Sequence, residues 1–251
     1  MIVTTDHGPI RELRLDRPPA NALSPELIAA LSAAIRNAPE EGARALVISG
    51  APGMLSAGLD VPLLLALDPP AIRELWRSLY AMLRLLASSP VPVAAAITGH
   101  APAGGAVISL FCDYRVMAEG DFKIGLNEVQ VGIPLPPVIH RALRRLMGAH
   151  RAERLAVGAT LLPAAEALRV GFVDELAPAD QVVTRAVEWC QRLLAFPSGA
   201  MSETRRLARA DLVALFDGTE SELDLMTGFW FNPETQGALR ALVERLAKRK
   251  G

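Results

Sequence analysis

Hydrophobic and polar positions follow two different spacings in the first part of the chain. Apolar and charged residues alternate over residues 10–15, the period of a half-buried strand, whereas Leu27, Leu31 and Ile35 recur at helical spacing. Ser24 and Pro25 have the residue types of a helix N-cap and a first helical position. We therefore expect a short strand pair and then a helix within the first forty residues.

Buried strands and helices then alternate along the chain. Apolar runs predict strands over residues 44–49, 91–98, 114–118 and 122–124. Loops of small residues are expected over 50–58 and 99–104, and helices over 61–67, 72–86 and 105–111. After Pro134, helical spacing continues over 137–147, 149–157, 164–168, 180–196, 200–216 and 233–250. This order predicts an α/β fold with parallel strands, in which residues 1–200 form the core and residues 201–251 a helical region.

Composition and charge exclude several classes of protein. The 251 residues are 51% hydrophobic, and the net charge of −1 lacks the basic excess of a nucleic-acid-binding protein. Cys112 and Cys190 provide neither a disulfide framework nor a zinc motif, and the four histidines are scattered, so we expect no metal site. With no targeting signal visible and a reducing compartment expected, we predict a cytoplasmic protein.

The uncharged run over residues 91–112 is long enough to span a bilayer. It contains Pro92, Pro102 and three glycines, which favour a strand, a turn and a buried helix over a membrane span. We expect no membrane partner.

Several catalytic motifs are absent. The chain has no P-loop and no G-x-G-x-x-G fingerprint after a strand. Residues 53–58 resemble a nucleophile elbow but have one residue too many before Ser56, so we interpret Ser56 as a small loop residue.

Two small-residue loops follow neighbouring predicted strands and lead into helices. They have the sequences SAGLD, residues 56–60, and HAPAGG, residues 100–105. Backbone N–H groups at helix starts lack intrahelical partners, and two of them converging would form an oxyanion hole. The same small residues also suit tight turns and close helix packing, so spacing alone leaves both interpretations open.

A third segment, KIGLNEV over residues 123–129, contains a carboxylate within an apolar stretch. Partial desolvation would raise the pKa of Glu128 toward that of a useful general base. The alternative is an exposed glutamate at the start of a helix.

These motifs together resemble the crotonase (enoyl-CoA hydratase/isomerase) superfamily. The resemblance rests on LSAGLD, TGHAPAGGAV and FKIGLNEVQVGIP, and extends from LDRPPANALS through nearly the whole chain. It implies a crotonase-like spiral of ββα units with a C-terminal helical trimerisation region. It also implies an acyl-CoA thioester substrate, no separate cofactor, and a homotrimer or dimer of trimers.

The resemblance implies roles for individual residues. It places the oxyanion hole at the N–H groups of Leu59 and Gly104, and a catalytic carboxylate at Glu128. One of the two glutamates that hydratases use would fall at Val107. The substrate-binding residues that it implies are Ala57, Gly58, Asp60, Val61, Val107 and Asn127.

The chain has a single such glutamate, in an IGLNE motif, and in this it resembles the Δ3,Δ2-enoyl-CoA isomerases of the superfamily. These enzymes move a proton from C2 to C4. A hydratase or another crotonase reaction remains an alternative, as does a non-catalytic binding protein. Which cations hold the CoA phosphates stays open. The candidate clusters are Arg141, Arg144 and Arg145; Arg205, Arg206 and Arg209; and residues 248–250.

Overall fold

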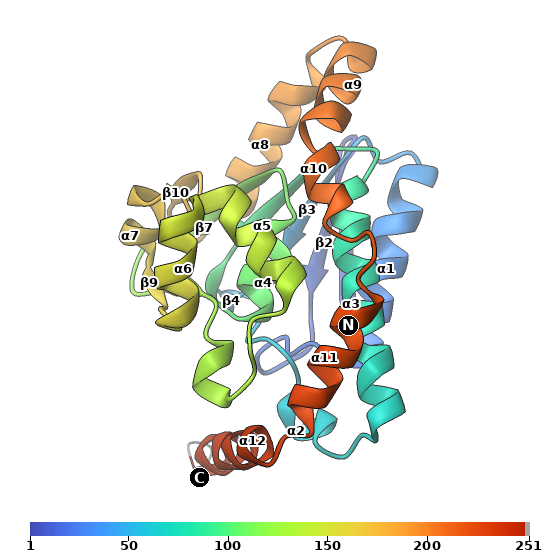
Figure 1. The fold of residues 1–251 in the computed structure, drawn as a ribbon. Coiled ribbons are helices and arrows are strands. Elements are labelled where there is room, and N and C mark those ends of the chain that lie inside the picture. The colour runs from blue at the N-terminus through green and yellow to red at the C-terminus, as the bar shows by residue number, and fades with distance from the viewer. Residues whose placement is uncertain (249–251) are drawn as a thin grey trace.

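A six-stranded sheet lies at the centre of the computed structural model, which describes residues 1–248 (Figure 1). Its strand order is β1 (Ile2–His7), β2 (Ile10–Leu15), β3 (Ala45–Ser49), β5 (Val93–Ile97), β7 (Tyr114–Ala118) and β10 (Glu175–Ala177). β1 pairs with β2 in the antiparallel sense, and every later pair in this sheet is parallel. The α/β fold with parallel strands is therefore confirmed.

A smaller second sheet contains the strands β4 (Gly53–Met54), β6 (Gly99–Pro102), β8 (Lys123–Gly125) and β9 (Leu162–Pro163). The predicted loop over 99–104 was wrong over its first four residues, because they pair with β4 and β8 as strand β6. β4, β6 and β8 each follow a strand of the main sheet. Helices follow β4 and β6, so these segments form ββα units.

Helices cover both faces of the main sheet. On one face lie α1 (Pro25–Glu40) and α3 (Pro69–Ser88), and on the other lies α8 (Val182–Leu194). Successive strand residues alternate between the two cores: Leu46 and Ile48 pack toward α1 and α3, whereas Val47 packs toward α8.

Local capping determines where the N-terminal helices begin. Ser24 accepts a hydrogen bond from the Leu27 N–H (3.2 Å) and caps α1 as predicted. α3 begins three residues earlier than predicted, because Asp68 caps it and Pro69 and Pro70 occupy its first positions. The helix predicted over 61–67 is shorter, α2 (Val61–Leu64).

The remaining helices run from α4 to the C-terminus. They are α4 (Gly104–Leu110), the 3-10 turn η1 (Glu128–Val131), α5 (Pro137–Met147), α6 (Ala149–Val157), α7 (Ala164–Arg169), α9 (Ser198–Ala208), α10 (Ala210–Ala214), α11 (Glu220–Trp230) and α12 (Pro233–Lys248). The helix predicted over 200–216 is divided at Arg209, whose guanidinium bonds to the Ala87 and Phe111 carbonyls. α11 was not predicted. The end of the predicted last helix, Lys250, lies outside the described residues.

The apolar run 91–112 is divided among β5, β6 and α4. Among residues 1–248, no helix has both the length and the apolar character needed to cross a membrane.

Candidate active site

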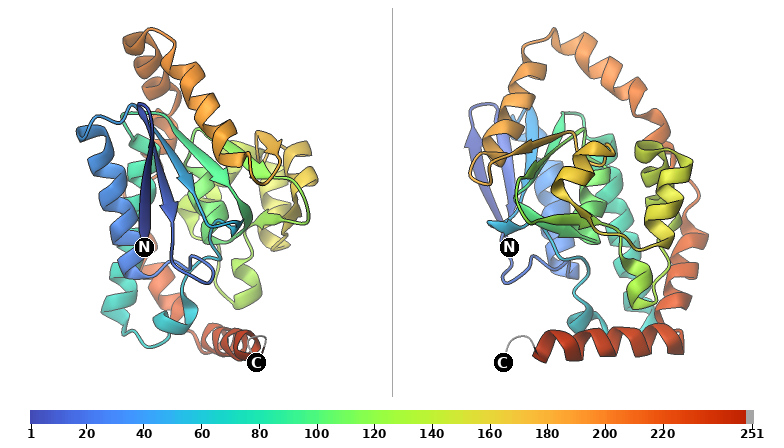
Figure 2. Two further views of the ribbon diagram at one scale, coloured as in Figure 1. Left: turned by 180° about the vertical axis from the view of Figure 1, so that it is seen from behind. Right: turned by 90° about the vertical axis from the view of Figure 1, so that its left-hand side faces the viewer.

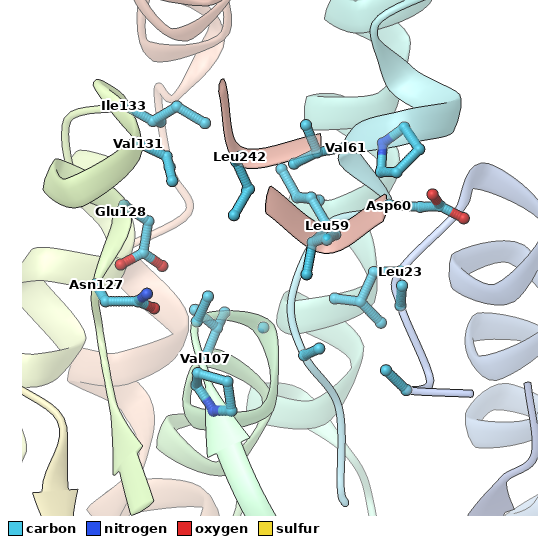
Figure 3. A pocket seen from close by; sticks show the side chains of 18 of the residues that line it. Leu23, Leu59, Asp60, Val61, Val107, Asn127, Glu128, Val131, Ile133 and Leu242 are labelled. Atoms are coloured by element: carbon cyan, nitrogen blue, oxygen red, sulfur yellow. The ribbon is translucent and has the colours of Figure 1, made fainter. Parts of the chain in front are cut away.

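A cavity of about 750 Å³ lies where the loop after β4 and the start of α4 after β6 meet η1 and α12. Its wall is mainly apolar and includes Leu59, Val107 and Leu242. The charged side chains on its lining within residues 1–248 are Arg17, Asp60, Glu128 and Arg245. Figure 3 shows Glu128 and Asn127 on one side of the cavity, facing Leu59, Val61 and Leu242 on the other.

The two small-residue loops touch beside this cavity. A Cβ atom added to Gly58, where φ is +97°, would lie 2.8 Å from Ala103 Cβ and 3.3 Å from the Gly104 nitrogen. Only glycine fits this approach, so Gly58 brings the loops together. Gly58 does not itself line the cavity, whereas Ala57, Asp60 and Val61 do.

Within residues 1–248, two cavity-lining backbone N–H groups of these loops have no acceptor. The neighbouring Asp60 N–H donates to Leu23 O (3.1 Å), but the Leu59 N–H has no acceptor within residues 1–248. Gly104 is the first residue of α4, where an N–H has no intrahelical partner, and the described part of the chain offers it no other. Leu59 and Gly104 both line the cavity.

Ser56 is fully buried, and its hydroxyl donates to Asn21 O (2.7 Å). The interpretation of Ser56 as a loop residue is confirmed, because its oxygen is not open to a substrate.

Glu128 begins η1 and points into the cavity (Figure 3). Its Oε2 atom is buried without a hydrogen-bond partner, and no cation within residues 1–248 forms an ion pair with it. Burial raises the pKa of Glu128 to about 7. The alternative of an ordinary exposed glutamate is therefore wrong. The neighbouring Asn127 Oδ1 is also buried and unpartnered in the described structure.

Val107 lies in α4, is 3% exposed, and provides an apolar wall to the same cavity. Asp60 accepts a bond from the Leu63 N–H (3.3 Å) at the start of α2 and pairs with Arg17 (2.5 Å). It therefore holds the first loop in shape while lining the cavity.

The sequence interpretation missed the contribution of α12. The resemblance implied that this C-terminal helical region serves trimerisation. Instead Leu239 is fully buried within this chain, and Leu242, Val243 and Leu246 line the cavity. Helical spacing reveals an apolar face but not what covers it, so the sequence held no signal for this role.

Most of the candidate cations for the CoA phosphates are engaged elsewhere. Arg141 pairs with Glu222, Arg145 with Asp211, Arg206 with Glu203, and both Arg205 and Arg209 with Asp113. Arg245 of α12 lines the cavity and has no ion pair within residues 1–248. Of the third cluster, residues 249 and 250 lie outside the described residues.

Residues 5–249 match the family model described as enoyl-CoA hydratase/isomerase. The chain belongs to this family. It is an enzyme of the enoyl-CoA hydratase/isomerase family, and its relatives carry both reaction names. Mouse mitochondrial enoyl-CoA delta isomerase 1 is 32% identical over 256 residues, covering 100% of this chain and 89% of the relative. A probable enoyl-CoA hydratase of Mycobacterium avium is also 32% identical, over 215 residues, covering 84% of this chain and 80% of the relative.

The crystal structure of human mitochondrial Δ3-Δ2-enoyl-CoA isomerase superposes with a TM-score of 0.94 at 29% identity. The match covers 100% of this chain and 99% of that one. The crotonase fold is therefore confirmed. Sequence identity alone does not choose between the two reactions, since an isomerase and a probable hydratase are equally identical to the chain.

Proposed function

We propose that this enzyme converts 3-enoyl-CoA thioesters into 2-trans-enoyl-CoA thioesters. The observation that carries the proposal is that Glu128 is the carboxylate of the lining without an ion pair within residues 1–248, since Asp60 pairs with Arg17. Val107 lines the same cavity at the position where the resemblance places the second acid of a hydratase. A hydratase must both activate water and protonate carbon, and Val107 can do neither. An isomerase needs one group that takes a proton and returns it.

The proposed reaction has two proton transfers. The Glu128 carboxylate removes a proton from C2 of the substrate, and the electron pair delocalises onto the thioester oxygen as a dienolate. The same carboxyl then returns this proton to C4, so that the double bond moves into conjugation and no other reactant is consumed. A pKa of about 7 suits both steps, because neither form of Glu128 is strongly disfavoured near neutral pH.

The dienolate oxygen would accept hydrogen bonds from the free N–H groups of Leu59 and Gly104. Each donor would contribute roughly 3 kcal/mol of transition-state stabilisation. Asn127 would contact the acyl chain or orient Glu128, while Ala57 and Val61 would line the thioester path. No separate cofactor takes part in this scheme, since coenzyme A is part of the substrate.

The decisive experiment follows the products of two separate incubations, one with 3-enoyl-CoA and one with 2-enoyl-CoA. We expect rapid isomerisation of the first and little hydration of the second. Glu128→Gln should lower kcat by about 10²–10⁴-fold, because the amide cannot accept the C2 proton. Its affinity for a saturated acyl-CoA should change little.

Glu119→Gln is the matched control, because Glu119 is an exposed carboxylate that does not line the cavity. If Glu128→Gln keeps its activity within tenfold of wild type, Glu128 is not the base. If wild type hydrates 2-enoyl-CoA as fast as it isomerises, the enzyme is a hydratase.

The assembly and location remain predictions. We propose a homotrimer or a dimer of trimers in the cytoplasm, with acyl-CoA as the small-molecule partner and no nucleic-acid or membrane partner.

A further inference from the structure

The carboxylate of Glu128 is held by its backbone rather than by other side chains. Among residues 1–248, no side chain bonds to Oε2, and the neighbouring residues of the cavity wall are largely apolar. Its position therefore depends on the conformation of η1, a single 3-10 turn.

η1 has few bonds of its own. The Gln130 N–H donates to Asn127 O (3.0 Å), the Gly132 N–H to Val129 O (3.1 Å) and the Ile133 N–H to Glu128 O (3.2 Å). Gly132 closes the turn in the left-handed region, with φ at +74°. One short turn with such bonds is not a rigid element by itself, since short 3-10 segments have poor hydrogen-bond geometry.

Two side-chain hydrogen bonds anchor this turn to other parts of the fold. The Gln130 side chain donates to Ala159 O (3.0 Å). The Thr235 hydroxyl donates to Gly132 O at 2.6 Å. Thr235 is 2% exposed, and a Cβ on Gly132 would lie only 3.1 Å from Thr235 Cα, so the first turn of α12 packs directly on the turn that bears Glu128.

α12 also covers the cavity. Leu242 lies seven residues after Thr235, roughly 10 Å further along the helix axis, and lines the cavity together with Val243. One helix therefore supports the Glu128 turn at its start and bounds the acyl cavity along its later turns. Figure 2 shows α12 lying across the end of the molecule that holds this site.

We propose that Thr235 is a positioning residue, which holds the Glu128 carboxylate at the reacting carbons by fixing the Gly132 carbonyl. It touches no substrate and acts only through η1. Because Thr235 belongs to α12, a movement of this helix at the cavity wall would also move the turn that bears Glu128. This inference rests on the proposed function, in which Glu128 transfers the proton.

The test compares Thr235→Val, which keeps the shape and removes the hydroxyl, with Thr235→Ser, which keeps the hydroxyl. We expect Thr235→Val to lower kcat by about ten- to a hundredfold, because a small displacement of the base is costly. KM should stay within about twofold, since binding contacts are kept. Thr235→Ser should keep kcat within about threefold of wild type. A fall in kcat with little change in KM, as expected for Thr235→Val, is what displacement of the base predicts.

Two further measurements separate positioning from general loss of stability. Thr227→Val is the matched control, because the Thr227 hydroxyl makes a similar bond inside α11, to Leu223 O (2.7 Å), away from η1. It should leave kcat unchanged. The pH profile of kcat/KM should also shift toward that of an ordinary glutamate in Thr235→Val, because a displaced carboxyl is less buried, and not in Thr235→Ser.

Wild-type kcat in Thr235→Val would overturn the proposal, as would an equal loss in Thr227→Val. If Thr235→Val does not fold, Thr235→Ala replaces it, with the same outcomes. Gly132→Ala gives an independent measurement. Its Cβ would lie 3.1 Å from Thr235 Cα and its φ of +74° disfavours alanine, so the turn must shift, and the fall in kcat should not add to that of Thr235→Val. Full activity of Glu128→Gln would instead refute the proposed function, whatever the Thr235 variants show.

Discussion

Glu128 has a raised pKa, about 7, because its carboxyl is buried on an apolar wall. As the base it must be ionised, so kcat/KM for isomerisation should rise with pH through about 7 and then level off. A profile that levels off near pH 5 would show that the working base is an ordinary solvated carboxylate. The rate is measured with 3-enoyl-CoA between pH 5 and pH 9.

The same pKa shift affects stability. The folded-state pKa of about 7 lies above the ordinary value of 4.5. The native state therefore binds the proton more tightly, and this stabilisation is complete below about pH 4.5 and is lost as pH rises through 7. Glu128→Gln carries no such charge. Relative to wild type, its free energy of unfolding should therefore increase by up to about 3 kcal/mol between pH 4.5 and pH 8.5.

Urea denaturation of both proteins at several pH values measures this difference. Glu119→Gln is the control, because its exposed carboxylate should give a difference independent of pH. If the difference in free energy of unfolding between Glu128→Gln and wild type does not change with pH, the wild-type carboxyl is solvated.

Val107 tests the one-carboxylate argument directly. Val107→Glu restores an acid on the α4 wall of the cavity and should raise hydration of 2-enoyl-CoA above the wild-type level. The gain should remain well below that of an evolved hydratase, because the new side chain lacks a supporting shell. The variant should also unfold more easily, since a buried unpaired carboxylate is costly. Val107→Gln has similar size without the acid and should gain no hydratase activity; an equal gain there would exclude an acid role.

Glu128 and Val107 could be placed because they lie in motifs that resemble those of the crotonase superfamily, and both line the cavity. The sequence could not predict that Gly58 would pack behind the cavity, because a loop sequence does not show which atoms face inward. Nor could it identify Thr235, whose hydroxyl contacts a carbonyl 103 positions away in the chain.

At the scale of elements, the sequence predicted best where local signals agreed. α1 begins at Pro25 with Ser24 as its cap. The strands β2, β3, β5 and β7 each begin within two residues of the predicted start. α11 was missed because its apolar residues are not confined to one face: Leu223 and Met226 are buried, but Leu225 and Phe229 are exposed. β6 was missed because four residues of a small-residue loop pair only through long-range contacts.

α12 provides the cation that we expect at the anionic end of the substrate. Arg245 is exposed, lines the cavity and lacks an ion pair within residues 1–248, whereas Arg17 is held by Asp60. Arg245→Gln should raise KM for an acyl-CoA by about three- to tenfold and leave kcat nearly unchanged, because one solvated phosphate contact contributes about 1 kcal/mol.

Two comparisons check that result. Arg240→Gln removes a charge from the same helix, at an exposed position away from the cavity, and should leave KM unchanged. An acyl-pantetheine thioester lacks the CoA phosphates, so wild type and Arg245→Gln should turn it over with the same KM. A rise in KM for both substrates would place Arg245 on the acyl path instead.

For the whole molecule, the unexplained feature is apolar surface on the C-terminal helices. Four large apolar side chains are exposed there: Phe196 after α8, Leu207 in α9, and Leu225 and Phe229 in α11. Figure 2 shows the α8–α9 segment projecting beyond the sheet. Leu225 and Phe229 lie four positions apart on one face of α11, and exposed apolar side chains grouped in this way are typical of an interface. α12, by contrast, covers the cavity of its own chain with Leu242, Val243 and Leu246.

We therefore expect a trimer or a dimer of trimers whose contacts include α11. Sedimentation velocity over a hundredfold range of concentration should show an assembly of three or six chains for wild type. Leu225→Glu with Phe229→Glu should shift it toward monomer, because two carboxylates would be buried without partners in the interface. Ala33→Glu places the same charge on the exposed side of α1 and should leave the assembly unchanged.

Since α12 of the same chain lines the cavity, the dissociated double variant should keep much of its activity per site. A wild-type monomer at every concentration would leave this apolar surface without its expected partner and refute the predicted assembly.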